Sequence, residues 1–216
     1  MNGNNVTAYN LTQHTPDSVF KVAILGAEST GKTTLCRDLA AHFASPWVPE
    51  YMRTYLQAKW DNEQATCTWE DLLPIAQGQT ELENKLARQA AQSVRPTINP
   101  QNSKNSDKQS IPNKSYLFCD TTLFELMVYS HWYYDDCPAA LKHAALVHHY
   151  DLILLTEVDT PWVADDLRDA PHQREEISAY FASQLDTHDK VFRRIGGARE
   201  QRVSQVVEWL GNLQST

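Results

Sequence analysis

Eight residues near the start of the chain have the types and the spacing needed to hold a polyphosphate. Residues 26–33 read GAESTGKT and fit the pattern G-x-x-x-x-G-K-[ST]. In this pattern the backbone N–H groups and the positive end of the next helix face the phosphates, the lysine reaches the terminal phosphates, and the last hydroxyl ligates Mg²⁺. We therefore expect a nucleoside triphosphate here. The expected contacts are Gly26, Glu28, Ser29, Thr30, Gly31, Lys32, Thr33 and Thr34.

The flanking residues predict the strand and the helix that this mechanism requires. Residues 21–25 form a short apolar run with β-branched members, which is typical of a buried strand. In residues 34–43, Leu35, Leu39 and Phe43 fall on one helical stripe. A chance match to a short motif is the alternative, and this flanking context argues against it.

Two carboxylates follow the next expected strands. Asp120 ends the apolar run 116–119, and Glu50 ends the short run 47–49. Ligands of parallel sheets collect at the carboxyl ends of strands, so Asp120 is expected to hold Mg²⁺ together with Thr33. Glu50 is expected to accept the proton of an attacking hydroxyl or to bind a sugar. The alternative for Asp120 is a solvated acid at a strand end. The alternative for Glu50 is an acid favoured by the dipole at a helix N-terminus.

Two arginines lie in the polar segment 162–174, between an expected strand and an expected helix. Guanidinium groups such as those of Arg168 and Arg174 stabilise the charge that develops during phosphoryl transfer, so both are candidate catalytic groups. Surface ion pairs with the neighbouring aspartates are the alternative. Trp132 belongs to an aromatic cluster on which a planar base could stack, although core packing is the commoner use of such residues.

The bulk composition restricts the class of partner. The chain has 216 residues and a net charge of −8, from 19 basic and 27 acidic residues, which argues against a nucleic-acid partner. No apolar run approaches the length of a membrane span, and the first twenty residues lack the apolar core of a signal peptide. The four cysteines show no CxxC spacing. We therefore expect a cytoplasmic protein that contacts no membrane.

Alternation of strand and helix patterns predicts an α/β fold with a parallel sheet flanked by helices. Residues 1–18 are expected to form a flexible tail, and 19–216 one domain with a flexible insertion at 93–115 and a small lid at about 160–175. The expected strands are 21–25, 47–50, 116–119, 151–155 and 191–195. The expected helices are 34–43, 51–60, 69–92, 123–132, 139–149, 175–185 and 200–213.

Several segments together resemble the ribosylnicotinamide kinase domain of NadR-type NAD-salvage proteins, in the P-loop NTPase superfamily. They are GAESTGKTTL, PEYMRTYL, IAQGQ, CDT and DTPWVADDLRD, and the resemblance spans about 21–213. It implies phosphorylation of nicotinamide riboside by ATP, with Mg²⁺, on the 5′-hydroxyl to give nicotinamide mononucleotide. It also implies that Glu50, Tyr51 and Arg53 form the nucleoside pocket, and that Arg168 and Arg174 belong to a lid. Thr121-Thr122 departs from the family, where a second acid is expected.

The multidomain relatives carry nucleotidylyltransferase and DNA-binding parts that have no counterpart in this sequence, so only the kinase step is expected. Another P-loop kinase for deoxynucleosides or nucleoside monophosphates remains an alternative, as does a non-catalytic ATP- or GTP-binding module. A guanine-specific switch is disfavoured because the chain has no Asn-Lys-x-Asp motif. The residues do not decide whether Asp120 or Glu50 is the base, nor the oligomeric state. The candidate substrate contacts are Glu50, Tyr51, Arg53, Asp120 and Trp132; the candidate catalytic residues are Lys32, Asp120, Glu50, Arg168 and Arg174.

Overall fold

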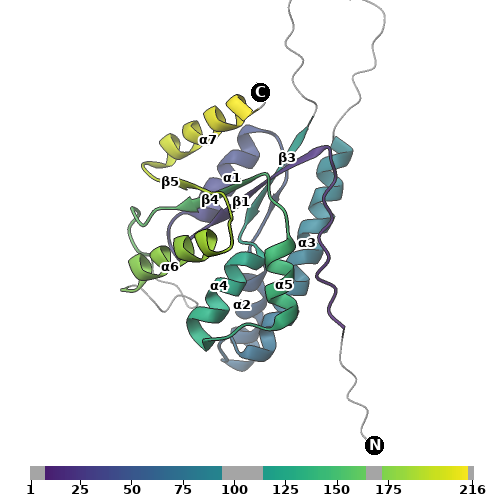
Figure 1. Ribbon diagram of the computed structural model, residues 1–216, viewed down its shortest axis with the longest axis vertical. Helices are drawn as coiled ribbons and strands as arrows, with labels where there is room; N and C mark the ends of the chain where they lie inside the picture. Colours follow the sequence, from purple (N-terminus) through teal and green to yellow (C-terminus); the bar gives the residue numbers. More distant parts are fainter. Residues whose placement is uncertain (1–7, 94–113, 164–171, 214–216) are drawn as a thin grey trace, which may run out of the picture.

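The computed structural model describes residues 8–93, 114–163 and 172–213. Their core is a five-stranded parallel sheet in the order β2-β3-β1-β4-β5 (Figure 1). The strands are β1 (Val19–Leu25), β2 (Trp47–Val48), β3 (Ser115–Asp120), β4 (Leu152–Thr156) and β5 (Arg193–Ile195). The helices are α1 (Lys32–His42), α2 (Tyr51–Glu63), α3 (Leu72–Ser93), α4 (Leu123–Tyr134), α5 (Ala139–Val147), α6 (Arg174–Thr187) and α7 (Arg199–Leu213), with a short 3₁₀ turn, η1 (Trp69–Asp71).

The helices cover both faces of the sheet because β1 is apolar on both sides. Val22 and Ile24 pack in the core that contains α1 and α7, whereas Ala23 and Leu25 pack in the core of the helices α3 to α6. Figure 1 shows this arrangement, with α1 and α7 on one side of the strands and α4, α5 and α6 on the other. Near-continuous apolar strands are what a parallel sheet covered on both faces requires. The predicted α/β fold class is confirmed.

The observed elements match the predicted ones closely, with differences at their ends. β2 has two residues rather than four, since Pro49 follows it and has no N–H to give to a sheet. α1 begins at Lys32, two residues before the expected start, because the last residues of the glycine motif are already helical. The predicted insertion at 93–115 falls outside the described residues apart from its two ends, which belong to α3 and β3.

Residues 8–18 differ from the flexible tail expected for 1–18. They run along α3 (Figure 1), where the Gln13 amide donates to Glu83 at 2.7 Å and the His14 N–H donates to Asn84 at 2.6 Å. The ammonium of the fully buried Lys21 donates to the His14 carbonyl at 2.7 Å and to Glu83 at 2.9 Å. The composition suggested a tail because the segment is rich in Asn, Gln and Thr and has no periodic pattern of apolar residues. In the structure, side-chain amides and backbone groups of residues 8–18 form hydrogen bonds with α3 instead.

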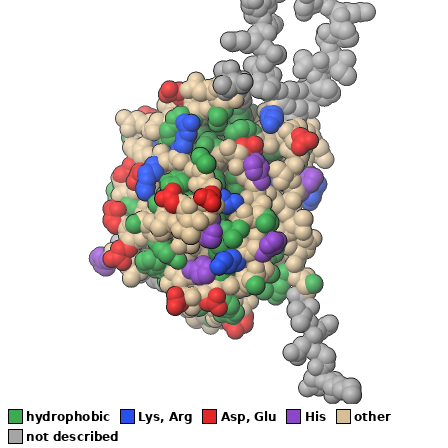
Figure 2. All heavy atoms as spheres, in the orientation of Figure 1, with side chains coloured by type: hydrophobic (Ala, Val, Ile, Leu, Met, Phe, Trp, Pro, Cys, Tyr) green, Lys and Arg blue, Asp and Glu red, His purple; other side chains and the backbone are tan. Residues whose placement is uncertain are grey.

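The surface carries both signs of charge. On the face in Figure 2, acidic, basic and histidine side chains are interspersed. In the described part of the chain, no helix is long and apolar enough to cross a membrane. All four cysteines are free thiols.

Helix α3 fixes the start of α2 through two adjacent residues. The ring of Tyr51 lies against Gly78 so closely that an added Cβ would sit 2.1 Å from its Cε1 atom. The next residue, Gln79, is buried, and its side-chain oxygen accepts a hydrogen bond from the Tyr51 N–H at 2.7 Å. The position of α2, and of Glu50 immediately before it, therefore depends on the absence of a side chain at Gly78.

We expect Gly78→Ala to destabilise the protein. Alanine favours a helix over glycine by about 1 kcal/mol, but overpacking against the Tyr51 ring costs roughly 1–3 kcal/mol. Gly211→Ala in α7 is the matched control, because an added Cβ there meets nothing within 4 Å. It should stabilise by up to about 1 kcal/mol. Urea unfolding of both variants measures the difference. A Gly78→Ala protein as stable as Gly211→Ala would refute the packing argument.

Candidate active site

The glycine-rich segment forms a loop between β1 and α1 that only glycine can form at two positions. Gly26 has φ +144° and Gly31 has φ +86°, a region that favours glycine. A Cβ on Gly26 would also lie 2.2 Å from the hydroxyl oxygen of Thr156 on β4. The loop leads directly into the N-terminus of α1, where backbone N–H groups and the helix dipole attract anions. The structure thus has the strand, loop and helix that a phosphate-binding loop requires.

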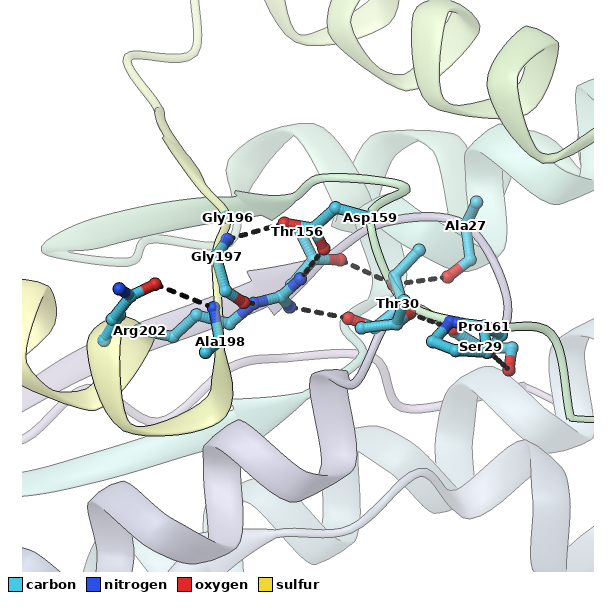
Figure 3. A network of polar contacts seen from close by, with 12 residues as sticks. Ala27, Ser29, Thr30, Thr156, Asp159, Pro161, Gly196, Gly197, Ala198 and Arg202 are labelled. Atoms are coloured by element: carbon cyan, nitrogen blue, oxygen red, sulfur yellow. Dashed lines mark hydrogen bonds and ion pairs between the residues drawn. The ribbon is translucent and has the colours of Figure 1, made fainter.

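The loop is held from behind by elements far away in the sequence (Figure 3). The Thr30 hydroxyl shares a hydrogen bond of 2.6 Å with that of Thr156, and it donates to the Ala27 carbonyl at 2.7 Å. Arg202 of α7 is buried, donates to the Thr30 carbonyl at 2.7 Å and pairs with Asp159 after β4. The loop is therefore supported by the sheet and by α7.

The segment after β4 contacts the outer side of the loop. The Arg174 guanidinium donates to the carbonyl of Thr160 at 2.9 Å and to that of Ser29 at 3.2 Å. The Thr160 hydroxyl also donates to the Ser29 carbonyl, at 2.6 Å. Arg174 does not line the cavity in this conformation. The other predicted arginine, Arg168, lies outside the described residues.

A cavity of about 490 Å³ opens in front of the loop. It brings the predicted phosphate contacts together with the predicted acceptor-side residues Glu50 and Arg53, whose side chains lie 3.8 Å apart. Its lining residues are Glu28, Ser29, Thr30, Gly31, Lys32, Thr33, Thr34, Glu50, Met52, Arg53, Leu56, Glu125, Tyr129, Thr160, Pro161 and Val163.

Asp120 lies beside the end of the phosphate-binding loop, as predicted. It is 1% exposed and accepts a hydrogen bond of 2.5 Å from the Thr33 hydroxyl. Burial, assisted by the negative charge of Glu50, raises its pKa to about 6. Its other oxygen, Oδ1, is buried and makes no hydrogen bond within the described residues. An unsatisfied buried carboxylate oxygen beside a hydroxyl fits a hard cation such as Mg²⁺.

Within the described residues, no group of three acidic, histidine or cysteine side chains is arranged to hold a metal ion alone. Mg²⁺ commonly binds through one or two protein oxygens and takes its other ligands from water and substrate phosphates. Thr33 and Asp120 would supply the protein oxygens.

Two predicted substrate contacts lie outside the cavity. The Tyr51 ring packs against Gly78 of α3 and lies near the ring of Tyr55. Trp132 packs against Tyr180 of α6, with ring centroids 5.4 Å apart. Core packing, the alternative considered for the aromatic cluster, describes Trp132 in this structure.

Sequence reasoning missed Glu125, which lies beneath the loop. This residue of α4 is 2% exposed, and its carboxylate is 3.2 Å from the Lys32 ammonium. Burial is the main cause that raises the pKa of Glu125 to about 8, and Lys32 opposes the shift. One signal was available, because Glu125 is the only acid in the otherwise apolar stretch 123–130.

Lys32 is surrounded by carboxylates. Burial alone would lower its pKa, but the charges of Glu125, Glu50 and Asp120 outweigh burial and raise the pKa above its usual value. The ammonium therefore stays charged at neutral pH, as a phosphate-binding lysine must.

The fold and the site define a P-loop protein with a kinase-like parallel sheet. Residues 21–202 match the family described as "AAA domain", so the chain belongs to that family. It is 26% identical over 186 residues to the "Trifunctional NAD biosynthesis/regulator protein NadR" of Escherichia coli (strain K12), and this match covers 85% of the chain but 40% of that protein. The chain thus spans less than half the length of this relative.

Solved structures agree on the fold. NadR in complex with NR superposes with a TM-score of 0.69 at 20% identity, covering 92% of this chain and 52% of that one. Thymidylate kinase from Ehrlichia chaffeensis superposes with a TM-score of 0.57 at 11% identity, covering 89% and 99%. The predicted resemblance to NadR-type proteins and the predicted P-loop kinase fold are confirmed.

The raised pKa of Glu125 predicts a pH dependence of stability. Its carboxyl keeps a proton in the folded protein up to about pH 8, whereas the unfolded chain loses it near the ordinary value of 4.5. Stability therefore falls as the pH rises through this window. Between about pH 6 and pH 8 the unfolding free energy of the wild type should fall by about 2 kcal/mol more than that of Glu125→Gln. Urea unfolding at several pH values measures both slopes, and equal slopes would contradict the assignment.

Proposed function

We propose that the protein is a kinase that transfers a phosphoryl group from ATP to the 5′-hydroxyl of nicotinamide riboside. One observation carries the proposal: a single cavity holds the phosphate-binding loop and the carboxylate of Glu50, with Asp120 bonded to Thr33 beside it. A kinase needs this combination, because donor phosphates and an acceptor hydroxyl must meet beside a group that can take a proton.

The donor half of the cavity would bind ATP. Loop N–H groups and the start of α1 face the phosphates, and Lys32 provides the positive charge for the terminal ones. Thr33 and Asp120 would hold Mg²⁺, which neutralises charge on the β- and γ-phosphates. The free thiols of all four cysteines are consistent with the reducing cytoplasm in which such a kinase would work.

The charge of the cavity favours a cationic acceptor. Among the described residues, its lining includes the carboxylates of Glu28 and Glu50, with that of Asp120 beside them, and two basic side chains, Lys32 and Arg53. Nicotinamide riboside carries a positive pyridinium ring, whereas the common deoxynucleosides are neutral. An acidic, partly buried surface attracts a cation by direct Coulomb interaction. The charge of the cavity and the similarity to NadR both favour nicotinamide riboside over the deoxynucleosides as the acceptor.

Glu50 is the better placed of the two candidate bases. Asp120 is committed to Thr33, whereas Glu50 lines the cavity, precedes α2 and makes no side-chain cap to that helix. The Glu50 carboxylate would take the proton of the 5′-hydroxyl. The hydroxyl oxygen would form a bond to the γ-phosphorus, while the bond from that phosphorus to the oxygen that leaves with ADP breaks. The predicted lid would then contribute Arg168 and Arg174 to the charge on the transferred group.

The direct test is mass spectrometry of products formed from ATP, Mg²⁺ and a panel of acceptors. Nicotinamide riboside should gain one phosphoryl group, while thymidine, deoxyadenosine, deoxycytidine and thymidine monophosphate should react far more slowly. Lys32→Ala should lower kcat/KM at least about 100-fold, as losing a transition-state charge contact does. Lys85→Ala, an exposed lysine on α3, is the control. Phosphorylation of a deoxynucleoside instead would favour the alternative of a deoxynucleoside or nucleoside monophosphate kinase. If no acceptor were phosphorylated, the alternative of a non-catalytic nucleotide-binding module would be favoured.

Two carboxyl variants separate the base from the metal ligand. Glu50→Gln should lower kcat by roughly 100-fold or more, the size of a lost general base, without changing the Mg²⁺ concentration needed for half-maximal rate. Asp120→Asn should raise that concentration, since it removes the charged metal ligand. Steady-state kinetics with Mg²⁺ titration measures both effects. The reverse pattern would assign the base to Asp120.

A further inference from the structure

All three protons of the Lys32 ammonium are already engaged by the protein. The Nζ atom donates to the carbonyl oxygens of Gly26 at 2.7 Å and Ala27 at 3.1 Å, and it pairs with the Glu125 carboxylate at 3.2 Å. A lysine ammonium has three donors and no more. A phosphate oxygen can therefore bind Lys32 only by replacing one of these three partners.

Glu125 is the partner whose replacement is favoured. The two carbonyls are neutral and belong to the loop itself, whereas the carboxylate carries the same sign of charge as the incoming phosphate. It also occupies the floor of the loop: one oxygen accepts a hydrogen bond from the Gly26 N–H at 3.3 Å, and the other accepts one from the Thr121 hydroxyl at 3.3 Å. When it is ionised, Glu125 is thus an anion held where Lys32 and the first loop amide meet.

We propose that Glu125 is an internal competitor of the polyphosphate: its ionised carboxylate competes with a phosphate oxygen for Lys32 and so lowers the affinity for the nucleotide. This proposal rests on the nucleotide-binding half of the proposed function and not on the identity of the acceptor. Glu125 is a positioning residue in this role, since it acts on the nucleotide through Lys32.

The surroundings of Glu125 make the competition dependent on pH. Lys32 of α1, Glu50 before α2 and Asp120 at the end of β3 act on its charge, and the buried hydroxyl of Tyr129 lies one turn further along α4. Because the pKa of Glu125 is raised to about 8, its carboxyl is ionised at about pH 9 and protonated at about pH 6.5. The competition should therefore operate at the higher pH and fade at the lower one.

The experiment measures binding without an acceptor nucleoside. Isothermal titration with ATP and with inorganic tripolyphosphate would compare the wild type, Glu125→Gln and Glu125→Asp at about pH 9 and about pH 6.5. At the higher pH, Glu125→Gln should bind both ligands about tenfold more tightly, since a buried like charge has been removed. Glu125→Asp keeps the charge and should stay close to the wild type. At the lower pH, Glu125→Gln and the wild type should converge.

Glu83→Gln is the matched control, because Glu83 is another buried acid that pairs with a lysine, Lys21, away from the cavity. It should bind as the wild type does, and thermal unfolding would verify that each variant is folded. Glu125→Ala replaces Glu125→Gln if the latter does not fold.

Several results would overturn the proposal. They are a neutral variant that binds no more tightly than the wild type at about pH 9, an equal gain in Glu125→Asp, or a gain that is undiminished at about pH 6.5. Because no acceptor is present, a protein that shows the expected binding but phosphorylates no nicotinamide riboside would refute the proposed function alone. Absence of any polyphosphate binding would refute both.

Discussion

The site depends on one constraint: the backbone between β1 and α1 must turn sharply from the strand into the helix, with positive φ angles at Gly26 and Gly31. Glycine at positions 26 and 31 allows the positive φ angles of the turn. Glycine alone does not select this conformation, since a glycine-rich loop in isolation samples many conformations. The conformation is selected from behind, where Thr156 binds Thr30 and the buried Arg202 binds the Thr30 carbonyl. In the proposed function a phosphate would meet a preorganised loop, and little of the binding energy would go into ordering it.

The local sequence carried enough information to predict the phosphate-binding half of the site. The motif, the apolar strand before it and the helix stripe after it are all short-range patterns, and Asp120 was found because strand ends of a parallel sheet share one edge. Arg202 could not be found in this way, and for Glu125 the only local signal was its place as the one acid in an apolar stretch. Each contacts the loop only because the fold brings together residues that are 172 and 99 positions apart along the chain.

The direction of side chains was the second feature that the sequence could not predict. The aromatic cluster at 129–134 gave no indication of which rings would face a ligand, and the structure places Tyr129 on the cavity while Trp132 packs on Tyr180. The contacts of residues 8–18 were likewise not predictable from their composition. Their polar composition suggests a tail, yet a segment needs only a few well-placed partners, such as Glu83 and Asn84, to be held against a helix.

The two halves of the cavity are built on separate supports. The proposed donor half rests on β4 and α7. The proposed acceptor half rests on α3, whose Gln79 accepts from the Tyr51 N–H and donates to the Thr121 carbonyl at 3.4 Å. In the proposed kinase, changes in α2 or α3 would alter the acceptor pocket while the phosphate-binding loop stays intact, so that one fold could serve different substrates. Lys32 and Glu125 lie where the halves meet. Through their pairing, the charge of a triphosphate bound as proposed would act on the proposed acceptor side.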